Sequence, residues 1–310
     1  MTAAAAARSQ AGLSPAARGM LVMLLAMFLF SLNDAMGKWL VSTYTVGQVL
    51  LIRSAFALAI LAPFVWRAGL SSLVRVERPW QQLARVVCST VEVFCFYYSV
   101  SYLPLADVVT YWLAAPIYVA AMSPFLLGER VGPIRWTAIA IGFIGVVIAL
   151  TPSGTVEPLA IGAAIVGTLA FALMVVTGRT LRGTPDKTLV TFQLLGSLAA
   201  GLVLSPFGWV TPTAPDFILL GALGVVAMFA HICVNRAVKL ADAAIIAPFQ
   251  YTMLPWGIIL GWLFFDDLPR PVMLIGAAII TLSGLVIYIR ERKQQRSNSV
   301  VADTISGDIP

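Results

Sequence analysis

Charged side chains are scarce in this sequence. Asp, Glu, Lys and Arg make up 11% of its 310 residues, whereas an ordinary soluble domain has about 25%. Hydrophobic residues make up 60%. A soluble fold of this length could not bury so much apolar side chain and still present a wetted surface. The composition therefore excludes a soluble globular enzyme and predicts an integral membrane protein.

Histidine and cysteine are also scarce. The single histidine, His231, excludes a metal site built from several histidines and the His-Glu-x-x-His motif of metalloproteases. Cys88, Cys95 and Cys233 lie in apolar runs, which favours packing residues over a disulfide framework. The sequence has no Gly-x-x-x-x-Gly-Lys-Ser/Thr run, so nothing indicates ATP as the driving force. We therefore expect no catalytic residue, no metal and no cofactor.

Long apolar runs are the dominant pattern. A membrane-spanning helix needs roughly 20 apolar residues, and the runs do not alternate as the strands of a membrane barrel do. The first run contains Asn33 and Asp34 and has no convincing cleavage site, which favours a first span over a signal peptide. The sequence thus predicts an all-α integral membrane protein with ten spans, at 19–40, 46–66, 82–102, 107–127, 133–151, 157–178, 188–208, 215–235, 242–264 and 270–289.

The basic residues predict the orientation. All but three of the 20 Lys and Arg residues fall on one side of the ten spans, the exceptions being Lys38, Arg53 and Arg270. By the positive-inside rule this side is the cytoplasm, and both termini lie there. The rule also explains the sequence pI near 9.5 without a nucleic-acid partner. We expect a cytoplasmic tail at 1–18, a disordered cytoplasmic tail at 290–310, and a multi-pass protein of the inner membrane in contact with its lipids.

The two halves of the chain resemble each other. Because each half has five spans, an odd number, the second half must enter the membrane the other way up. The prediction is a pair of inverted five-helix repeats at 19–151 and 157–289. The matches, in order, are Phe30–Leu40 with Phe171–Leu181, Leu105–Asp107 with Leu240–Asp242, Glu129 with Asp266 and Asp267, and Gly145 with Gly284.

Inverted repeats favour transport. Exchanging the conformations of the two halves converts an outward-open state into an inward-open one, which is alternating access. The architecture therefore indicates a secondary transporter, and a receptor or structural protein would have no evident use for it. One chain contains both halves, so a monomer suffices, and a dimer is compatible with the pattern.

Polar groups at membrane depth are candidates for substrate binding, because each costs free energy there unless it is paired or hydrated. The first half places Asn33 and Asp34 in span one, Arg53 in span two and Glu92 in span three. Arg53 is predicted to meet a substrate carboxylate, and Asp34 or Glu92 an ammonium group. The alternative is that these charges pair with one another and fix helix packing. Lys38 could join them, although its place near a span end favours snorkelling to the headgroups.

The second half offers a different set. Met174 and Val175 stand where Asn33 and Asp34 stand in the first half, so the site is predicted to be chemically lopsided. His231 could couple transport to protons, or could simply be hydrogen-bonded in place. The further candidates for substrate binding are Gln193 and Gln250, and, for an aromatic outer mouth, Tyr98, Tyr111 and Trp112.

Prolines and aspartates mark other positions. Pro116, Pro248 and Pro255 interrupt the fourth span of each half and are predicted to be gating hinges or packing kinks. Asp107 and Asp242 open those spans, where an N-cap belongs, and capping is the predicted role of both. Asp266 and Asp267 are expected to cap a helix or bind loop partners.

These features also resemble a known family. The stretch Ser101–Val147 has a Leu-Ala-Asp opening, a span through Pro116, Gly128-Glu-Arg and Gly145-Val-Val, and is similar to the EamA-type repeat of the drug/metabolite transporter superfamily. The second copy keeps Leu-Ala-Asp and Gly284-Leu-Val, and has Asp266-Asp267 where the repeat usually has Gly-Glu. Within the superfamily the chain most resembles bacterial amino-acid and metabolite exporters.

This resemblance implies a transporter that exports amino acids or similar small zwitterions. The family also handles S-adenosylmethionine, drugs, polyamines and nucleotide-sugars, so S-adenosylmethionine-like metabolites, drugs or lipid-linked sugars are the alternative substrates. Facilitated diffusion and proton exchange both fit the sequence. A membrane-embedded enzyme is a remote alternative, for which Asp34 and Glu92 would have to act as a carboxylate pair.

Overall fold

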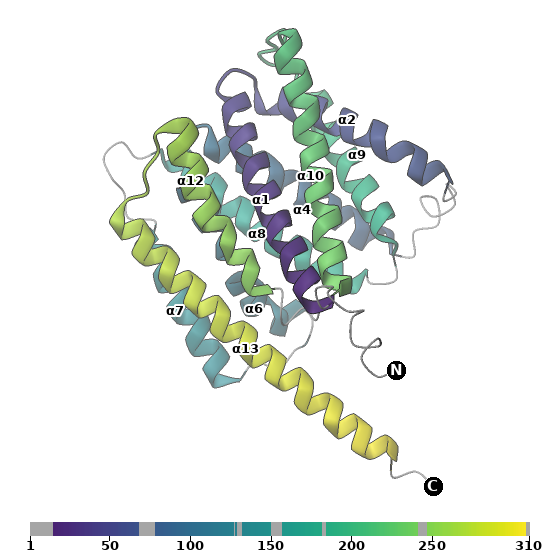
Figure 1. Ribbon diagram of the computed structural model, residues 1–310, viewed down its shortest axis with the longest axis vertical. Coiled ribbons are helices and arrows are strands. Elements are labelled where there is room, and N and C mark those ends of the chain that lie inside the picture. Colours follow the sequence, from purple (N-terminus) through teal and green to yellow (C-terminus); the bar gives the residue numbers. More distant parts are fainter. Residues whose placement is uncertain are drawn as a thin grey trace, which may run out of the picture.

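The computed structural model describes residues 15–67, 78–126, 128, 132–149, 157–181, 184–240 and 247–307. All regular secondary structure in these ranges is helical (Figure 1). The helices are α1 (Pro15–Val41), α2 (Val46–Arg67), α4 (Pro79–Val100), α5 (Leu105–Leu113), α6 (Ala115–Leu126), α7 (Pro133–Ala149), α8 (Pro158–Thr180), α9 (Asp186–Leu204), α10 (Ala214–Leu240), η2 (Ala247–Thr252), α12 (Met253–Phe265) and α13 (Pro271–Gly307).

The helices have the length and composition of membrane spans. Eight helical segments in the described part of the chain are long and apolar enough to cross a bilayer, and Trp136–Ala149 and Phe249–Phe265 are shorter apolar helices. Together they occupy the positions of the ten predicted spans, which confirms an all-helical protein with eight to ten apolar helices.

Proline sets where several helices begin. Pro79, Pro133, Pro158 and Pro271 are the first residues of α4, α7, α8 and α13. The first N–H groups of a helix have no partner inside the helix, so a residue without an N–H costs nothing there. Inside a helix, the missing N–H of a proline breaks the hydrogen-bond pattern. The fourth span ends as α5 at Leu113 and restarts as α6 at Ala115.

Pro116 accounts for that break, because it has no N–H to donate to the carbonyl of Trp112. Instead the N–H of Ile117 donates to the carbonyl of Ala114 at 2.9 Å. In the ninth span Pro248 lies in the 3₁₀ segment η2, and Pro255 is the third residue of α12. Both predicted proline interruptions therefore coincide with a change in helix geometry.

The last helix extends beyond its predicted end. Span ten was predicted to stop at residue 289 and to be followed by a disordered tail, but the backbone of α13 remains helical to Gly307. Residues 291–296 are good helix formers. Extending an existing helix also requires no new nucleation, which explains the difference.

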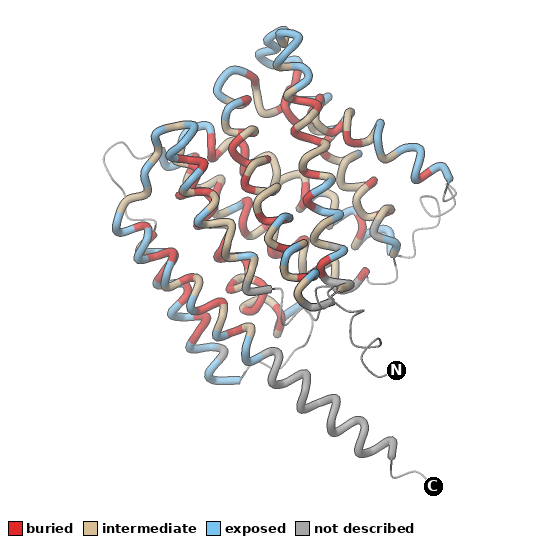
Figure 2. The backbone as a smooth tube through the Cα atoms, in the orientation of Figure 1, coloured by how far each residue is buried: buried red, intermediate tan, exposed pale blue. Residues whose placement is uncertain are grey.

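Helices of the two halves pack against each other in pairs. α1 packs along α10, α2 along α9, α4 along α8 and α7 along α13, and Figure 1 shows α7 and α13 side by side at the lower left. Each pair joins a helix before residue 150 to one after residue 157. The buried residues, red in Figure 2, lie along these contacts.

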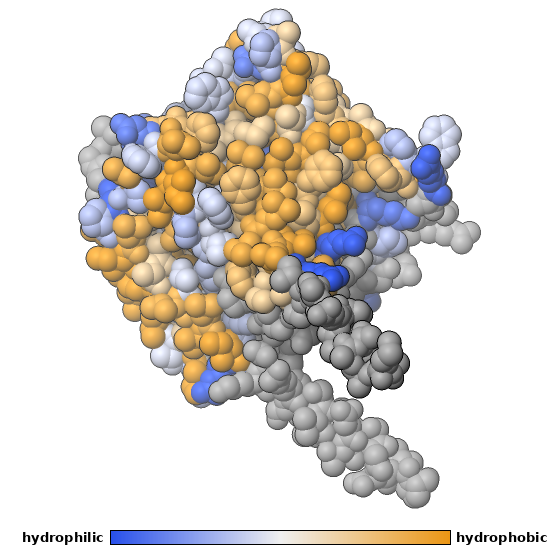
Figure 3. All heavy atoms as spheres, in the orientation of Figure 1, coloured by the Kyte–Doolittle hydropathy of each residue, from blue (hydrophilic) through white to orange (hydrophobic). Residues whose placement is uncertain are grey.

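Large apolar side chains cover much of the outside. Trp66, Trp80 and Phe125 are each at least 79% exposed, and the face in Figure 3 is largely hydrophobic. In water such a surface would associate, whereas lipid tails cover it at no cost. The outer surface of the bundle therefore suits contact with lipid.

Glycine allows the tightest contact between the halves. A Cβ at Gly224 of α10 would lie 2.1 Å from the backbone oxygen of Arg53 in α2. That oxygen belongs to the main chain and cannot rotate away. The contact therefore depends on the missing side chain.

We expect Gly224→Ala to lower the free energy of unfolding by about 1–3 kcal/mol, because the methyl group overpacks the contact between α10 and α2. Gly162→Ala is the matched control, since a Cβ there meets no heavy atom within 4 Å and alanine is the better helix former. Thermal melting of both variants in detergent measures the difference. Equal melting temperatures would contradict the packing account.

Candidate functional site

A hydrogen-bonded chain crosses the middle of the bundle. Asn33 of α1 is 4% exposed and its Nδ2 donates to the backbone oxygen of Leu223 in α10 at 2.7 Å. The hydroxyl of Tyr97 in α4 donates to Asn33 Oδ1 at 3.4 Å. Arg53 of α2 in turn donates to the Tyr97 hydroxyl. The chain therefore ties three helices of the first half to one of the second.

Tyr97 holds the guanidinium of Arg53 in two ways. Besides accepting a hydrogen bond, its ring lies under the guanidinium carbon, 5.2 Å from the ring centroid. The ring is 1% exposed and fits only because residue 37 is glycine, since a Cβ there would lie 2.2 Å from Tyr97 Cε1. Cation–π contact and hydrogen bonding together reduce the cost of a charge inside the bundle. Arg53 keeps further donors for another partner.

Glu92 lies on α4 beside this chain. Its Oε1 accepts a hydrogen bond from Trp112 Nε1 at 2.9 Å. Trp112 packs edge-on against Phe96 at 5.1 Å and closely against Gly167 of α8. Glu92 is thus fixed by α5, while Trp112 reaches the second half.

Asp34 differs from Glu92 in that its carboxylate has no direct partner among the described residues. It is 8% exposed, and its carboxylate makes no hydrogen bond within the described residues. Arg53 and Glu92 lie within electrostatic range. With all three ionised the cluster carries one excess negative charge. A buried carboxylate without a direct partner is costly, so Asp34 is the least satisfied carboxylate of this cluster.

The other predicted binding residues lie apart from this chain. Tyr98 is half-buried and stacks on Phe94 at 6.3 Å. Tyr111 is buried against Ala149 and Ala164. Within the ranges that the structure covers, neither hydroxyl forms a hydrogen bond with the Arg53 cluster.

The second-half candidates also remain outside the hydrogen-bonded chain. His231 is exposed on α10, packs edge-on against Phe30 at 4.9 Å, and is within electrostatic range of Arg53. Gln193 is half-buried on α9, and Gln250 is exposed in η2. The second half instead supplies backbone oxygens, as the predicted lopsidedness requires.

Two residues of the interior were missed by the sequence analysis. Tyr97 was one of several neighbouring aromatics, and nothing local distinguished it from Tyr98. Arg85 was counted with the loop charges, but it is half-buried in α4 and donates to the backbone oxygen of Met174 at 2.7 Å. Its Nε is buried without a hydrogen-bond partner. The cue was its place inside an apolar run, seven residues after Arg78.

Polar pairs join the halves at the end of the bundle where α1 finishes, towards the top of Figure 1. Lys38 forms an ion pair with Asp267 and donates to the backbone oxygen of Leu103 at 3.2 Å. Its side chain is only 14% exposed. The prediction that Lys38 snorkels to the headgroups is therefore wrong, because a partner 229 positions away in sequence takes its charge.

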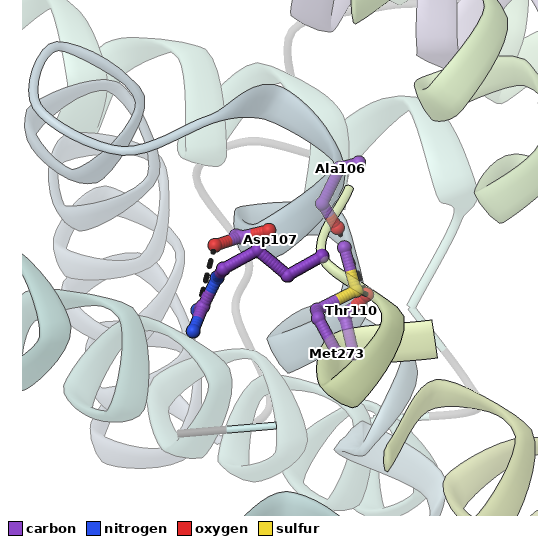
Figure 4. A network of polar contacts seen from close by, with 5 residues as sticks. Ala106, Asp107, Thr110 and Met273 are labelled. Atoms are coloured by element: carbon purple, nitrogen blue, oxygen red, sulfur yellow. Dashed lines mark hydrogen bonds and ion pairs between the residues drawn. The ribbon is translucent and has the colours of Figure 1, made fainter. Parts of the chain in front are cut away.

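Asp107 also differs from its prediction. The N-cap of α5 is Pro104, and no side chain caps it. Asp107 instead accepts from Arg270 at 3.3 Å. Figure 4 shows this contact beside Thr110, whose hydroxyl faces the sulfur of Met273 at 3.2 Å. Tertiary pairing thus replaces local capping at this position.

The α1–α2 loop and the start of α2 add two hydrogen bonds at the same end. Tyr44 donates to Asp216 at 2.6 Å, and this bond to a carboxylate raises the pKa of Tyr44. Gln48 donates to the backbone oxygen of Val210 at 2.6 Å. This end of the bundle is therefore closed.

Three of the residues singled out in the sequence are not fully described. Glu129 and Asp242, and the side chain of Pro248, lie outside the described residues.

Known proteins share this architecture. The model of the EamA-like transporter family matches residues 17–151 and 158–289. A riboflavin transporter of Rhizobium johnstonii is 30% identical, over 91% of this chain and 95% of that protein. A riboflavin transporter of Vibrio cholerae is 27% identical over 92% and 97%. An S-adenosylmethionine uptake transporter of Rickettsia prowazekii is 25% identical over 88% and 93%.

These matches cover nearly the whole chain and confirm the resemblance drawn from its repeats. The apolar helices and the bacterial relatives also agree on location. The chain therefore belongs to the EamA-like transporter family and is a multi-pass transporter of the inner membrane.

Proposed function

We propose that this protein carries riboflavin, or a closely related flavin, across the inner membrane by alternating access. The observation that carries the proposal is the 30% identity to a riboflavin transporter over nine-tenths of the chain. Riboflavin is neutral, with a planar aromatic ring system, carbonyl and ring-nitrogen acceptors, and a chain of hydroxyls. Its recognition requires aromatic contact and hydrogen bonds without an obligatory counter-charge.

The buried cluster offers these groups. Arg53 supplies donors beyond the one used on Tyr97, and Asp34 supplies acceptors that no described residue occupies. Trp112 supplies an aromatic surface fixed by its bond to Glu92. A few well-placed polar groups within an apolar site are typical of small-molecule recognition.

Alternating access rests on the two halves being inverted copies. The helix pairs support this arrangement. In chain order, the counterparts in the two halves are α1 and α8, α2 and α9, α4 and α10, and α7 and α13. Exchanging counterparts turns the α1–α10 contact into the α8–α4 contact, and leaves α2–α9 and α7–α13 unchanged. The family model also matches each half separately. A pseudo-two-fold axis in the membrane plane would produce this pattern.

The orientation follows from the basic residues, with both termini in the cytoplasm. The closed end that holds Lys38 and Asp267 then faces outward. The breaks at Ala114 and between η2 and α12 provide the hinges, and Pro116, Pro248 and Pro255 maintain them. Closing and opening would bend the fourth span of each half at these points.

The export of amino acids predicted from the sequence is the second candidate. The observation in its favour is that one cluster contains both signs of charge, Arg53 for a carboxylate and Asp34 for an ammonium group. The single excess negative charge would suit S-adenosylmethionine, a cation, as a third substrate class. A transport assay separates the three.

Proteoliposomes loaded with unlabelled riboflavin should take up labelled riboflavin by counterflow, because a carrier exchanges the ligand it recognises. Amino acids or S-adenosylmethionine inside the vesicles should give no stimulation. Vesicles containing a transporter of known substrate serve as the positive control. If those exchange and riboflavin does not, the flavin assignment fails, and stimulation by either other class identifies the replacement.

Tyr97→Phe should reduce the transport rate by roughly ten- to hundredfold, since hydrogen bonds to charged groups contribute about 1.5–3 kcal/mol. The substitution keeps the ring and removes only the hydroxyl that links Arg53 to Asn33. Tyr98→Phe is the matched control on the next residue and should transport normally. Counterflow normalised to reconstituted protein measures both. Equal rates for the two variants would refute the linking role of Tyr97.

Asp34→Asn should abolish transport without lowering the melting temperature. The substitution keeps the shape and loses no hydrogen bond within the described residues, but it replaces one of the two acceptor oxygens offered to the substrate by an amide N–H donor. Melting in detergent and counterflow in vesicles are measured on the same preparation. A stable Asp34→Asn protein that transports at the native rate would remove Asp34 from the mechanism.

A further inference from the structure

A cavity lies at the closed end of the bundle, away from the buried cluster. Its volume is about 220 Å³, below the 300–1,000 Å³ typical of sites for drug-sized ligands. It has room for a ring system rather than for a whole large metabolite. Its walls come from the ends of α1 and α4 and from α12, and the lining residues are Lys38, Trp39, Ser42, Val100, Ser101 and Phe265.

Two aromatic rings and an ammonium group shape this cavity. Trp39 and Phe265 lie 6.4 Å apart at an interplanar angle of 50°. Trp39 is 54% exposed, so its face is available to a ligand. The Lys38 ammonium lies 4.9 Å from the centroid of Phe265. The walls thus combine stacking surfaces with one positive charge.

The hydrogen-bonding groups define what fits. An ammonium has three donors, and Lys38 uses one on Asp267 and one on the backbone oxygen of Leu103. The third remains for a ligand. The hydroxyls of Ser42 and Ser101 donate to backbone oxygens at 2.6 and 2.8 Å, and keep only their lone pairs. This pattern suits a planar heterocycle that offers a carbonyl or ring-nitrogen acceptor to Lys38 and an N–H donor to the serine oxygens, and the ammonium disfavours a cation.

Lys38 is also half of the contact that closes this end. Asp267 lies just after α12, where Asp266 adopts a left-handed conformation with φ of 54°. The N–H of Asp266 bonds to Trp262 and that of Asp267 to Gly261, both at 3.1 Å, so the turn holds the Asp267 carboxylate in place. A ligand that accepts from the third donor of Lys38 therefore pulls the ammonium away from Asp267, at the seam between the halves.

We propose that this cavity is an outer recognition subsite for the planar ring of the substrate, and that ring binding draws Lys38 from Asp267 and loosens the outer closure. The identity of the ring as a flavin rests on the proposed function. The subsite itself rests on the geometry of Lys38, Trp39 and Phe265.

Lumiflavin, the flavin ring without the sugar-like chain, is the probe. Its binding to the purified full-length protein is followed by quenching of its fluorescence. We expect Lys38→Met and Trp39→Leu each to weaken binding at least tenfold. Trp262→Leu, a change of an equally exposed tryptophan outside the cavity, should leave it unchanged. S-adenosylmethionine should not compete with lumiflavin.

A charge swap separates ligand binding from closure. In the double variant Lys38→Asp/Asp267→Lys the ion pair can re-form, so the melting temperature should return to that of the native protein, but the affinity for lumiflavin should stay low. Recovery of both would show that Lys38 acts only as half of an ion pair, and would overturn the subsite. Unchanged binding in Lys38→Met and Trp39→Leu, or competition by S-adenosylmethionine, would overturn it equally.

The same measurements keep the two proposals apart. If riboflavin is transported and the affinity for lumiflavin does not depend on Lys38 and Trp39, the subsite fails and the transport proposal stands. If lumiflavin binding depends on both residues but riboflavin is not transported, the subsite stands and the substrate assignment fails.

Discussion

Arg53 carries a full charge inside a bundle of apolar helices, and the surrounding structure is arranged around that charge. The Tyr97 hydroxyl and ring hold the guanidinium, Asn33 holds the hydroxyl, and the Leu223 backbone oxygen holds Asn33. Two missing side chains make the arrangement fit, because Gly37 leaves room for the tyrosine ring and Gly224 lets α10 approach the backbone of Arg53. Polar groups in a membrane interior must be satisfied from within the protein.

This chain of contacts also explains how a lopsided site arises although the two halves are predicted to be repeats. The ionisable groups of the cluster, Asp34, Arg53 and Glu92, all come from the first half. The second half contributes backbone oxygens. That of Leu223 accepts a hydrogen bond from Asn33, and that of Met174 accepts one from Arg85. Met174 aligns with Asn33 in the predicted repeat, so the two aligned positions are used differently, one through its side chain and one through its main chain.

Much of the fold could be predicted because its signals are local. Runs of apolar residues predicted the positions of the spans, and the predicted starts at 157 and 270 lie one residue before α8 and α13. Pro116 predicted a break in span four, since a missing N–H acts within one turn. α13 ran past its predicted end because a polar sequence of helix formers carries no local stop signal.

The partners of the site residues could not be predicted in the same way. Lys38 and Asp267 are 229 positions apart, and Asp107 and Arg270 are 163 apart, so no spacing along one helix relates them. Tyr97 and Tyr98 point about 100° apart on one helix, and only the neighbouring Gly37 decides which of them meets Arg53. Arg85 resembled a loop charge because only the packing of α8 shows that it turns inward. Choice of partner therefore depended on tertiary contacts.

The coupling between Arg53 and Tyr97 tests the central claim most directly, and a double-mutant cycle measures it. Transport rates are compared for Arg53→Met, Tyr97→Phe and the double variant, all at equal amounts of reconstituted protein. The account predicts that the double variant is no slower than the slower single variant, with a coupling free energy of about 1 kcal/mol or more. Effects that simply multiply would show that the two side chains act independently, and would contradict a connected path from Arg53 to the second half.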